Sequence, residues 1–300
     1  MIAIDLGSNT LRVLLYDCVE EESTFSYETL VKTADGLVEC GRVSSEAVCR
    51  VINAIQTVQM KVDFSEHSVV AVTTEALRQA SNRADVLKEI FEVTGVAFDV
   101  ISGEEEARMT LLAVKKRLQR LLYPSANFVL VDIGGGSTEL IFNYGKKSIS
   151  KSFPIGIVTI AQSYQDLNDI EDALPHKMIE MQKFCTQMYA TRGISQAFVA
   201  TAGTPTTIAS MKLGYEYADY DASQVNGTLL LADELDFYLD KLLCMSFEGR
   251  EKAVGIGRSD LILAGILIYK HIYKILSFKE CIIIDDGLRE GVALDFCDKL

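Results

Sequence analysis

Two aspartates in this chain are each followed by a short turn of small residues. Asp5 stands in IAIDLGSNTLR and Asp132 stands in LVDIGGGSTEL. The turn residues are Gly7, Ser8 and Asn9 in the first segment and Gly134, Gly135, Gly136 and Ser137 in the second. A turn of glycine and serine lets backbone N–H groups converge on an anion, because no bulky side chain blocks the approach. The two segments therefore predict two phosphate-binding loops.

A carboxylate beside a bound phosphate is unfavourable unless a cation lies between them. Asp5 and Asp132 end their strands next to the turns, and Glu139 alternates with Ser137 on the returning strand. Hard divalent cations prefer carboxylate, phosphate and water oxygens as ligands. We therefore expect Asp5, Asp132 and Glu139 to hold Mg²⁺ or another divalent cation, and a role for these acids in orienting a water molecule stays open.

The elements that position these residues alternate between short apolar strands and longer helices. We expect strands at 1–6, 11–17, 26–33, 68–73 and 97–101 and helices at 44–62, 83–94 and 103–121. After Pro124 the pattern begins again, with strands at 128–132, 138–143, 148–153, 196–200 and 281–285 and helices at 156–164, 176–190, 204–211, 232–244, 258–276 and 288–298. Such alternation predicts an α/β protein with a sheet that contains parallel strands and is covered on both faces.

Length and composition restrict the class of protein. A chain of 300 residues exceeds one ordinary core, so two domains are expected. No apolar run reaches the ~18 residues of a membrane helix, and the start has no signal-peptide pattern. The seven cysteines are scattered, which favours reduced thiols and a cytoplasmic protein. The formal net charge of −13 argues against nucleic acid as a partner, and a polyanionic ligand would have to be attracted by a local site.

Seven segments resemble, in this order, motifs of the exopolyphosphatase/guanosine pentaphosphate phosphohydrolase (Ppx/GppA) family. They are AIDLGSNT, VTTEALRQASN, ISGEEEAR, VDIGGGSTEL, SFPIG, GRSDLILAG and DGLREG. The two turns resemble the phosphate loops of the superfamily that contains actin, sugar kinases and the 70-kDa heat-shock proteins. This resemblance implies two actin-like, ribonuclease H-like domains with a phosphate-binding cleft between them. It places the first domain at 1–123, with a C-terminal helix at about 287–300, and the second at 124–286.

The resemblance also assigns the catalytic base. It identifies Glu106, directly before Ala-Arg in ISGEEEAR, as the carboxylate that orients the attacking water and accepts its proton. Glu104 and Glu105 are expected on the solvated first turn of a helix capped by Ser102. Arg78, in TTEALRQASN, is expected to bind phosphate because a guanidinium can donate to two phosphoryl oxygens at once. Asp132 and Glu139 complete the predicted catalytic set.

The function that the resemblance implies is that of a bacterial, cytoplasmic, Mg²⁺-dependent phosphoanhydride hydrolase. Its substrate is inorganic polyphosphate, which loses a terminal phosphate, or guanosine pentaphosphate, which loses its 5′ phosphate. No nucleic-acid or membrane partner is expected, and a homodimer stays open. The alternatives are a non-enzymatic regulatory protein that binds polyphosphate or nucleotide, and an ATP-dependent kinase. Two positions depart from the family and bear on substrate preference: Ala202 replaces a usual Gly, and Thr159 replaces an Arg of many relatives.

Overall fold

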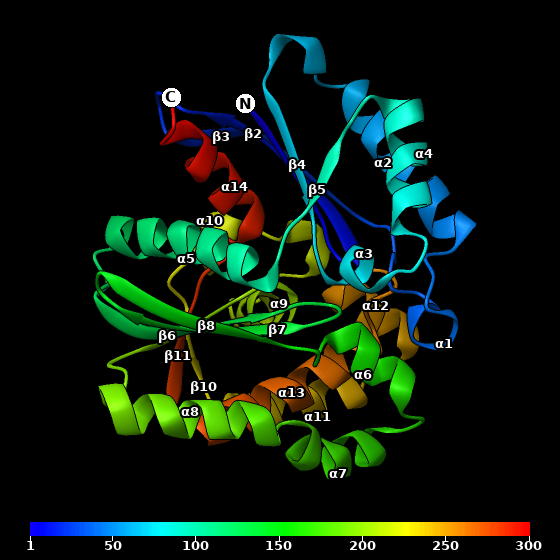
Figure 1. Ribbon diagram of the computed structural model, residues 1–300. Helices are drawn as coiled ribbons and strands as arrows, with labels where there is room; N and C mark the ends of the chain where they lie inside the picture. Colours follow the sequence, from blue (N-terminus) through cyan, green and yellow to red (C-terminus); the bar gives the residue numbers. More distant parts are fainter. The chain divides into compact units, whose positions relative to one another are not determined.

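The computed structural model describes residues 1–300 and contains two β-sheets with helices around them (Figure 1). The chain divides into two compact units, the first Met1–Ala113 with Gly287–Leu300 and the second Val114–Asp286. The first change of unit falls within helix α5 (Gly103–Arg120). The predicted α/β class with two actin-like sheets is confirmed, while the domain boundaries read from the sequence stay a prediction.

The first unit is built on a five-stranded sheet of order β3-β2-β1-β4-β5. Its strands are β1 (Ile2–Leu6), β2 (Thr10–Asp17), β3 (Glu22–Leu30), β4 (Val69–Thr73) and β5 (Phe98–Val100). The first three strands are antiparallel neighbours, whereas β4 and β5 run parallel to β1. Its helices are α1 (Leu37–Cys40), α2 (Ser45–Gln59), α3 (Glu75–Gln79), α4 (Arg83–Thr94), the start of α5 and α14 (Leu288–Cys297), with a 3₁₀ turn at Phe64–Glu66.

The second unit repeats this plan and adds one strand, giving the order β10-β11-β9-β6-β7-β8. Its strands are β6 (Asn127–Ile133), β7 (Thr138–Tyr144), β8 (Lys147–Phe153), β9 (Phe198–Thr201), β10 (Leu229–Leu231) and β11 (Glu280–Ile283). Its helices are α6 (Ile157–Ser163), α7 (Leu167–Lys177), α8 (Ile179–Arg192), α9 (Gly203–Lys212), α10 (Ala222–Val225), α11 (Glu234–Leu243), α12 (Phe247–Val254) and α13 (Leu261–Leu276), with a 3₁₀ turn at Tyr217–Asp219. Strands β6, β7, β8, β9 and β11 pair as β1 to β5 do, so the sequence repeat is also a repeat of topology.

Most expected elements are present, and the differences have local causes. A helix was expected at 176–190, and residues 167–175 were not predicted to be helical, although Asp166 caps a helix that starts at Leu167. Helix α7 continues through Pro175 and ends at Lys177, and α8 follows at once. Strand β10 and helix α12 were not predicted, because a strand of three residues and a helix of eight residues are too short for a clear periodicity. No helix of the chain is both long enough and apolar enough to cross a bilayer.

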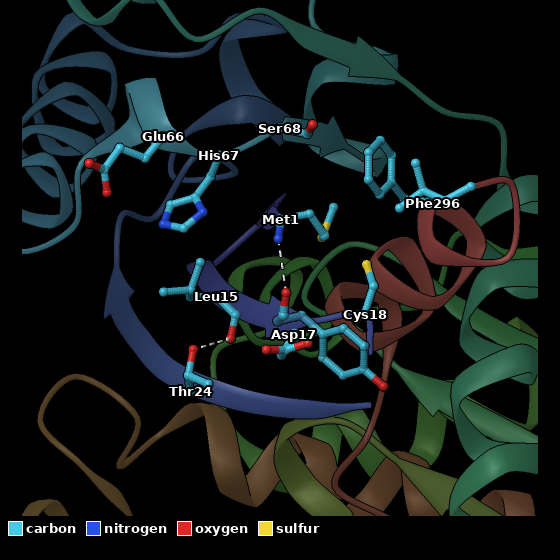
Figure 2. Close-up of a pocket in the computed structure, with 11 residues that line it drawn as sticks. Met1, Leu15, Asp17, Cys18, Thr24, Glu66, His67, Ser68 and Phe296 are labelled. Carbon is cyan, nitrogen blue, oxygen red and sulfur yellow. Dashed lines mark hydrogen bonds between the residues drawn. The ribbon is translucent and has the colours of Figure 1, made fainter. Parts of the chain in front are cut away.

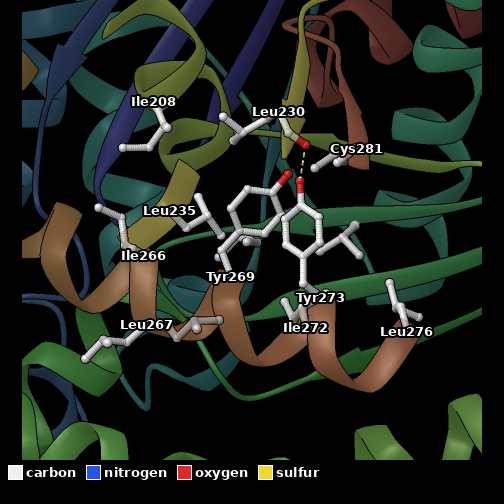
Figure 3. Close-up of a cluster of buried hydrophobic side chains, with 14 of the residues drawn as sticks. Ile208, Leu230, Leu235, Ile266, Leu267, Tyr269, Ile272, Tyr273, Leu276 and Cys281 are labelled. Carbon is white, nitrogen blue, oxygen red and sulfur yellow. Dashed lines mark hydrogen bonds between the residues drawn. The ribbon is translucent and has the colours of Figure 1, made fainter. Parts of the chain in front are cut away.

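Helix α13 lies at the centre of the second unit's core (Figure 3). It is buried on nearly all sides, as expected for a helix that is apolar all round. The ring centroids of Tyr269 and Tyr273 lie 6.0 and 5.0 Å from that of Phe198 in β9. The hydroxyl of Tyr273 donates to the carbonyl oxygen of Leu230 at 2.6 Å, which satisfies a buried polar group and ties β10 to the helix.

The last helix, α14, packs into the core of the first unit. Leu288, Val292 and Leu294 are buried there against β-strand residues that include Leu14 and Val72. The helix approaches α5 so closely that a Cβ at Gly291 would lie 2.0 Å from the carbonyl oxygen of Met109. The side chain of Arg108 donates to Asp295 at 2.6 Å. Residues at opposite ends of the chain are therefore joined in one core.

The expectation that all seven cysteines are reduced is wrong, because Cys18 and Cys297 form a disulfide. The turn after β2 lies against the end of α14, which brings their Cα atoms to 5.4 Å across a sequence separation of 279. The other five cysteines are free thiols, and burial raises the pKa of Cys185 to about 12. Cys18 also lines a pocket of about 330 Å³ beside Met1, His67 and Phe296 (Figure 2).

Reduction of this disulfide is expected to lower the free energy of unfolding by about 2–5 kcal/mol, because a native cross-link restricts the unfolded chain. The Tm should fall when a reducing agent is added. A Cys18→Ser/Cys297→Ser double variant should melt at the same temperature with and without it. Thiol titration of the denatured protein should find five thiols before reduction and seven after. Identical melting of the oxidised and reduced wild-type protein would contradict this expectation.

Candidate active site

The first glycine-rich turn joins β1 to β2, and the N–H of Gly7 donates to the carbonyl oxygen of Thr10 at 3.0 Å to close it. The segment after β3 donates to the other carbonyl oxygens of the turn. These bonds run from Thr33 Oγ1 to Gly7 at 2.6 Å, from Ala34 N to Ser8 at 2.9 Å and from Val31 N to Asn9 at 2.9 Å. The carbonyl groups thus point into the protein, and the N–H groups of Ser8 and Asn9 have no protein acceptor.

The second turn, between β6 and β7, is held in the same way. The N–H of Gly134 donates to the carbonyl oxygen of Ser137 at 2.9 Å. The first turn of α6, directly after β8, donates to the loop carbonyls from behind. These bonds run from Ile157 N to Gly134 at 3.0 Å and from Val158 N to Gly135 at 2.8 Å. Because the carbonyl oxygens of Gly7–Asn9 and of Gly134 and Gly135 are occupied, the loops can present N–H groups, which is the arrangement that binds an anion.

Gly156 allows this contact between α6 and the second loop. A Cβ at Gly156 would lie 2.2 Å from the carbonyl oxygen of Gly135 and 2.4 Å from the carbonyl carbon of Gly136. Both neighbours are backbone atoms of the loop, so they cannot turn aside as a flexible side chain would. The SFPIG segment therefore acts as a close-fitting support for the phosphate loop.

Two predicted acids face each other across β6 and β7. Asp132 is directly opposite Glu139, and Glu139 is directly opposite Ser152 on β8. Opposite residues of an antiparallel pair have Cβ atoms ~4.5–5.5 Å apart on the same face of the sheet. Glu139 is only 1% exposed, and its Oε1 accepts hydrogen bonds from Ser137 Oγ at 2.8 Å and Ser152 Oγ at 2.7 Å. The hydroxyl of Ser137, which was predicted to bind phosphate, thus donates its hydrogen bond to Glu139.

The equivalent position of the first unit has a different charge pattern. Asp5 is opposite Arg12, and Arg12 is opposite Glu28, to which its Nε donates at 2.9 Å. Asp5 therefore faces a guanidinium where Asp132 faces a second carboxylate. The structure has no group of three or more histidine, cysteine or acidic residues arranged to hold a metal ion. The oxygen pair of Asp132 and Glu139 fits a hard cation that takes its other ligands from phosphate and water. A share of Asp5 in that site stays a prediction.

Glu106 and Arg78, which lie far apart in the sequence, form an ion pair in the first unit. Arg78 Nη1 donates to Glu106 Oε2 at 2.8 Å and to the carbonyl oxygen of Ile101 at 2.9 Å. The opposite edge of the guanidinium donates to Glu75 Oε2, from Nη2 at 2.7 Å and from Nε at 3.0 Å. Burial alone would lower the pKa of Arg78, but the carboxylates of Glu106 and Glu75 outweigh it and raise the pKa, so the side chain stays charged.

Glu75 was not singled out from the sequence. The signal that would have found it is its place three residues before Arg78, a spacing at which helical side chains meet. Because four of the five N–H groups of Arg78 already donate to Glu75, Glu106 and Ile101, the arginine orients the two acids. Phosphate binding by Arg78 stays a prediction.

The three glutamates at the start of α5 have different environments. Glu104 and Glu105 are exposed, as expected, whereas Glu106 is only 8% exposed. Ser102 Oγ accepts from Glu105 N at 3.2 Å, and Glu105 Oε2 accepts from Ser102 N at 3.2 Å, which is a reciprocal capping box. Glu105 therefore caps the helix, and Glu106 is the buried acid of the three.

Residues 22–300 match the Ppx/GppA phosphatase family. The chain belongs to this family. Exopolyphosphatase 2 of Mycobacterium tuberculosis is 25% identical and is matched over 97% of each chain. A bifunctional 3-dehydroquinate synthase/phosphatase of Fusobacterium nucleatum is 24% identical over 95% of this chain, which spans only 44% of that protein's length.

Solved structures of the Ppx/GppA family show the same fold. The Aquifex aeolicus family member is 27% identical, with a TM-score of 0.75 over 99% of this chain and 97% of that one. An exopolyphosphatase from Cytophaga hutchinsonii is 21% identical, with a TM-score of 0.85 over 99% and 97% of the two chains. Each phosphate loop is defined within its own unit, and the predicted cleft between the domains stays a prediction.

Ala202, where Ppx/GppA proteins usually have glycine, keeps a backbone that glycine favours. Its φ is 70° and its ψ is −171°, just before α9. An L-residue in this region costs ~1–3 kcal/mol. Ala202 therefore holds a strained backbone conformation with a methyl group on it. Thr159, at the other departure from the family, closes the first turn of α6 by accepting from Gly156 N at 3.1 Å.

The pocket drawn in Figure 2 lies away from the glycine-rich turn of the same unit, as the bounds of β1 and β2 show. It is lined by Met1, at the start of β1, and by Cys18, just after the end of β2. The loop of Gly7–Asn9 is at the other end of both strands. Five strand residues at ~3.3 Å each separate the two places by ~16 Å, so this pocket is not part of the candidate active site.

Gly156→Ala is expected to displace the second glycine-rich loop, because the added Cβ would meet backbone atoms of that loop. The rate of phosphate release should fall by at least tenfold. Such overpacking typically costs ~1–3 kcal/mol. Gly203→Ala is the matched control, since a Cβ there has no neighbour within 4 Å. Phosphate release and circular dichroism should be measured for both. Full activity in Gly156→Ala would show that the loop does not need this support.

Proposed function

We propose that the protein is a phosphoanhydride hydrolase that releases terminal phosphate from inorganic polyphosphate. The observation that carries this proposal is the ion pair between the buried Glu106 and the half-buried Arg78, which provides a carboxylate and a guanidinium together in a Ppx/GppA chain. The M. tuberculosis relative, matched over 97% of both chains, is named exopolyphosphatase 2. Guanosine pentaphosphate, losing its 5′ phosphate, is the alternative substrate because the bond that breaks is of the same class.

In the proposed reaction, water attacks the terminal phosphorus and the bond from that phosphorus to the bridging oxygen breaks. The products are inorganic phosphate and a polyphosphate chain that is one unit shorter and keeps the bridging oxygen. Transfer of a phosphoryl group depends mainly on positioning and on stabilisation of charge. Glu106 orients the water and accepts its proton, while Arg78 holds the Glu106 carboxylate in place. The N–H groups of the two loops, Ser8 and Asn9 in one and Gly135 and Gly136 in the other, bind phosphoryl oxygens.

The proposal includes a divalent cation, Mg²⁺ in the first instance. Asp132 and Glu139 would hold it, with Asp5 as a further predicted ligand. When bound, such an ion neutralises negative charge on the phosphate oxygens. This role removes a difficulty of the site, because two opposed carboxylates would otherwise repel both each other and the substrate. With a net charge of −13, attraction for a polyanion must arise locally, so affinity should fall as salt rises.

Two other functions are less well supported. A regulatory protein that only binds polyphosphate would not need a buried carboxylate held by an arginine, yet Glu106 is so held. A kinase would need a second substrate pocket, and the pocket of Figure 2 lies near the far ends of β1 and β2. A cytoplasmic location and a homodimer remain predictions.

Assays of phosphate release test the proposed function directly. We expect release from polyphosphate, measured beside guanosine pentaphosphate and ATP, and we expect chelation of divalent cations to abolish it. Comparison of kcat/KM for the two leading substrates would assign the preference. Tight polyphosphate binding without any phosphate release, in the presence of Mg²⁺, would favour the regulatory function instead.

Glu106→Gln is expected to lower kcat by ~10²–10⁴-fold, because the amide keeps the shape but cannot accept the proton. Substrate affinity should be retained or should rise, since a negative charge near phosphate is removed. Glu105→Gln is the matched control, because Glu105 is exposed and takes part in the helix cap. A large loss in Glu105→Gln with little loss in Glu106→Gln would move the base by one residue.

A further inference from the structure

The carboxylate of Glu139 is held by Ser152, the first residue of the SFPIG segment, to which neither the sequence analysis nor the phosphate loops assign a role of its own. Ser152 on β8 donates its hydroxyl to Glu139 Oε1 at 2.7 Å, and Ser137 donates to the same oxygen at 2.8 Å. We propose that Ser152 is a positioning residue, which orients Glu139 for cation binding beside Asp132. This inference rests on the proposed function, in which Glu139 is a ligand of the divalent cation.

The register of the sheet explains why Ser152 has this place. Asp132, Glu139 and Ser152 are opposite one another on three successive strands, so Glu139 has an acid on one side and a hydroxyl on the other. A buried carboxylate needs hydrogen-bond donors, because burial without them is costly. Two hydroxyls that donate to one oxygen restrict rotation of the carboxylate. They therefore fix how Glu139 is presented next to Asp132.

The chain around Ser152 supports the second phosphate loop at further points. The hydroxyl of Thr138, the first residue of β7, donates to the carbonyl oxygen of Ile155 at 2.5 Å. The N–H groups of Ile157 and Val158 donate to the loop carbonyls. One segment of seven residues, 152–158, thus orients both a cation ligand and the anion-binding turn. This links the geometry of the cation site to that of the phosphate site.

Ser152→Ala should weaken cation binding, since loss of a hydrogen bond to a metal ligand typically costs 10–100-fold in metal affinity. Calorimetric titration of the substrate-free protein with Mg²⁺ and with Mn²⁺ measures this without reference to turnover. We expect a Kd for the cation at least tenfold above that of the wild type. The cation concentration that gives half-maximal activity should rise equally, while kcat at saturating cation should change little.

Two variants control for structural effects. Ser152→Thr keeps the hydroxyl and suits a strand, so it should restore cation affinity to within a few fold of the wild type. Ser150→Ala changes the same strand on the same face, opposite Ile141, and should leave the Kd unchanged. Circular dichroism should show all three variants folded.

The outcomes separate this inference from the proposed function. A wild-type protein that binds and needs the cation, together with an unchanged Kd in Ser152→Ala, would overturn the role of Ser152 alone. Equal weakening in Ser152→Ala and Ser152→Thr would also overturn it, because the hydroxyl would then not be the cause. A wild-type protein that hydrolyses polyphosphate without binding Mg²⁺ or Mn²⁺ would overturn this role and the cation in the proposed function together.

Discussion

The carbonyl oxygens of Gly7–Asn9 and of Gly134 and Gly135 are hydrogen-bonded from behind, and the predicted phosphate site depends on this constraint. A tight turn that exposed its carbonyl groups would repel phosphate, whereas one whose carbonyl groups are occupied presents N–H groups. In both units the donors come from the chain that follows the third strand, residues 31–34 in one and 157–158 in the other. The third strand of each sheet therefore brings the support of its loop into place.

The two units share a strand topology but carry different charges at equivalent positions of their sheets. At equivalent positions Asp5 faces Arg12, and Asp132 faces Glu139. The first pair is neutral as a whole, and the second has two negative charges on one face of the sheet. In the proposed function a divalent cation would offset the two negative charges of the second pair, whereas Arg12 already balances Asp5 in the first. The hydroxyls that donate to Glu139 and the guanidinium that donates to Glu106 have the same effect, which is to give a buried carboxylate hydrogen-bond donors and a fixed orientation.

Helix α5 carries the proposed base and also contains the point at which the chain passes from the first unit to the second. Glu106 lies in its first turn, and Arg117, near its other end, donates to both carboxylate oxygens of Asp286 at 2.6 and 3.0 Å. The chain leaves the second unit directly after Asp286 and entered it within α5. A bidentate pair of this kind is geometrically specific. It joins the C-terminal half of α5 to residue 286, and the N-terminal turn of the same helix carries the proposed base.

The sequence by itself determined the repeated strand–turn–strand segments, the α/β class and the family, because glycine turns and apolar periodicity are local properties. It also separated Glu106 from Glu104 and Glu105 through the resemblance. Short elements such as β10 and α12 escaped it, since their periodicity is too brief to read. Only the tertiary structure showed the ion pair of Arg78 with Glu106, the hydrogen bond from Ser152 to Glu139 and the disulfide between Cys18 and Cys297 across 279 residues. These contacts depend on strand register and on the return of α14, which arise from packing between distant segments and leave no local pattern in the sequence.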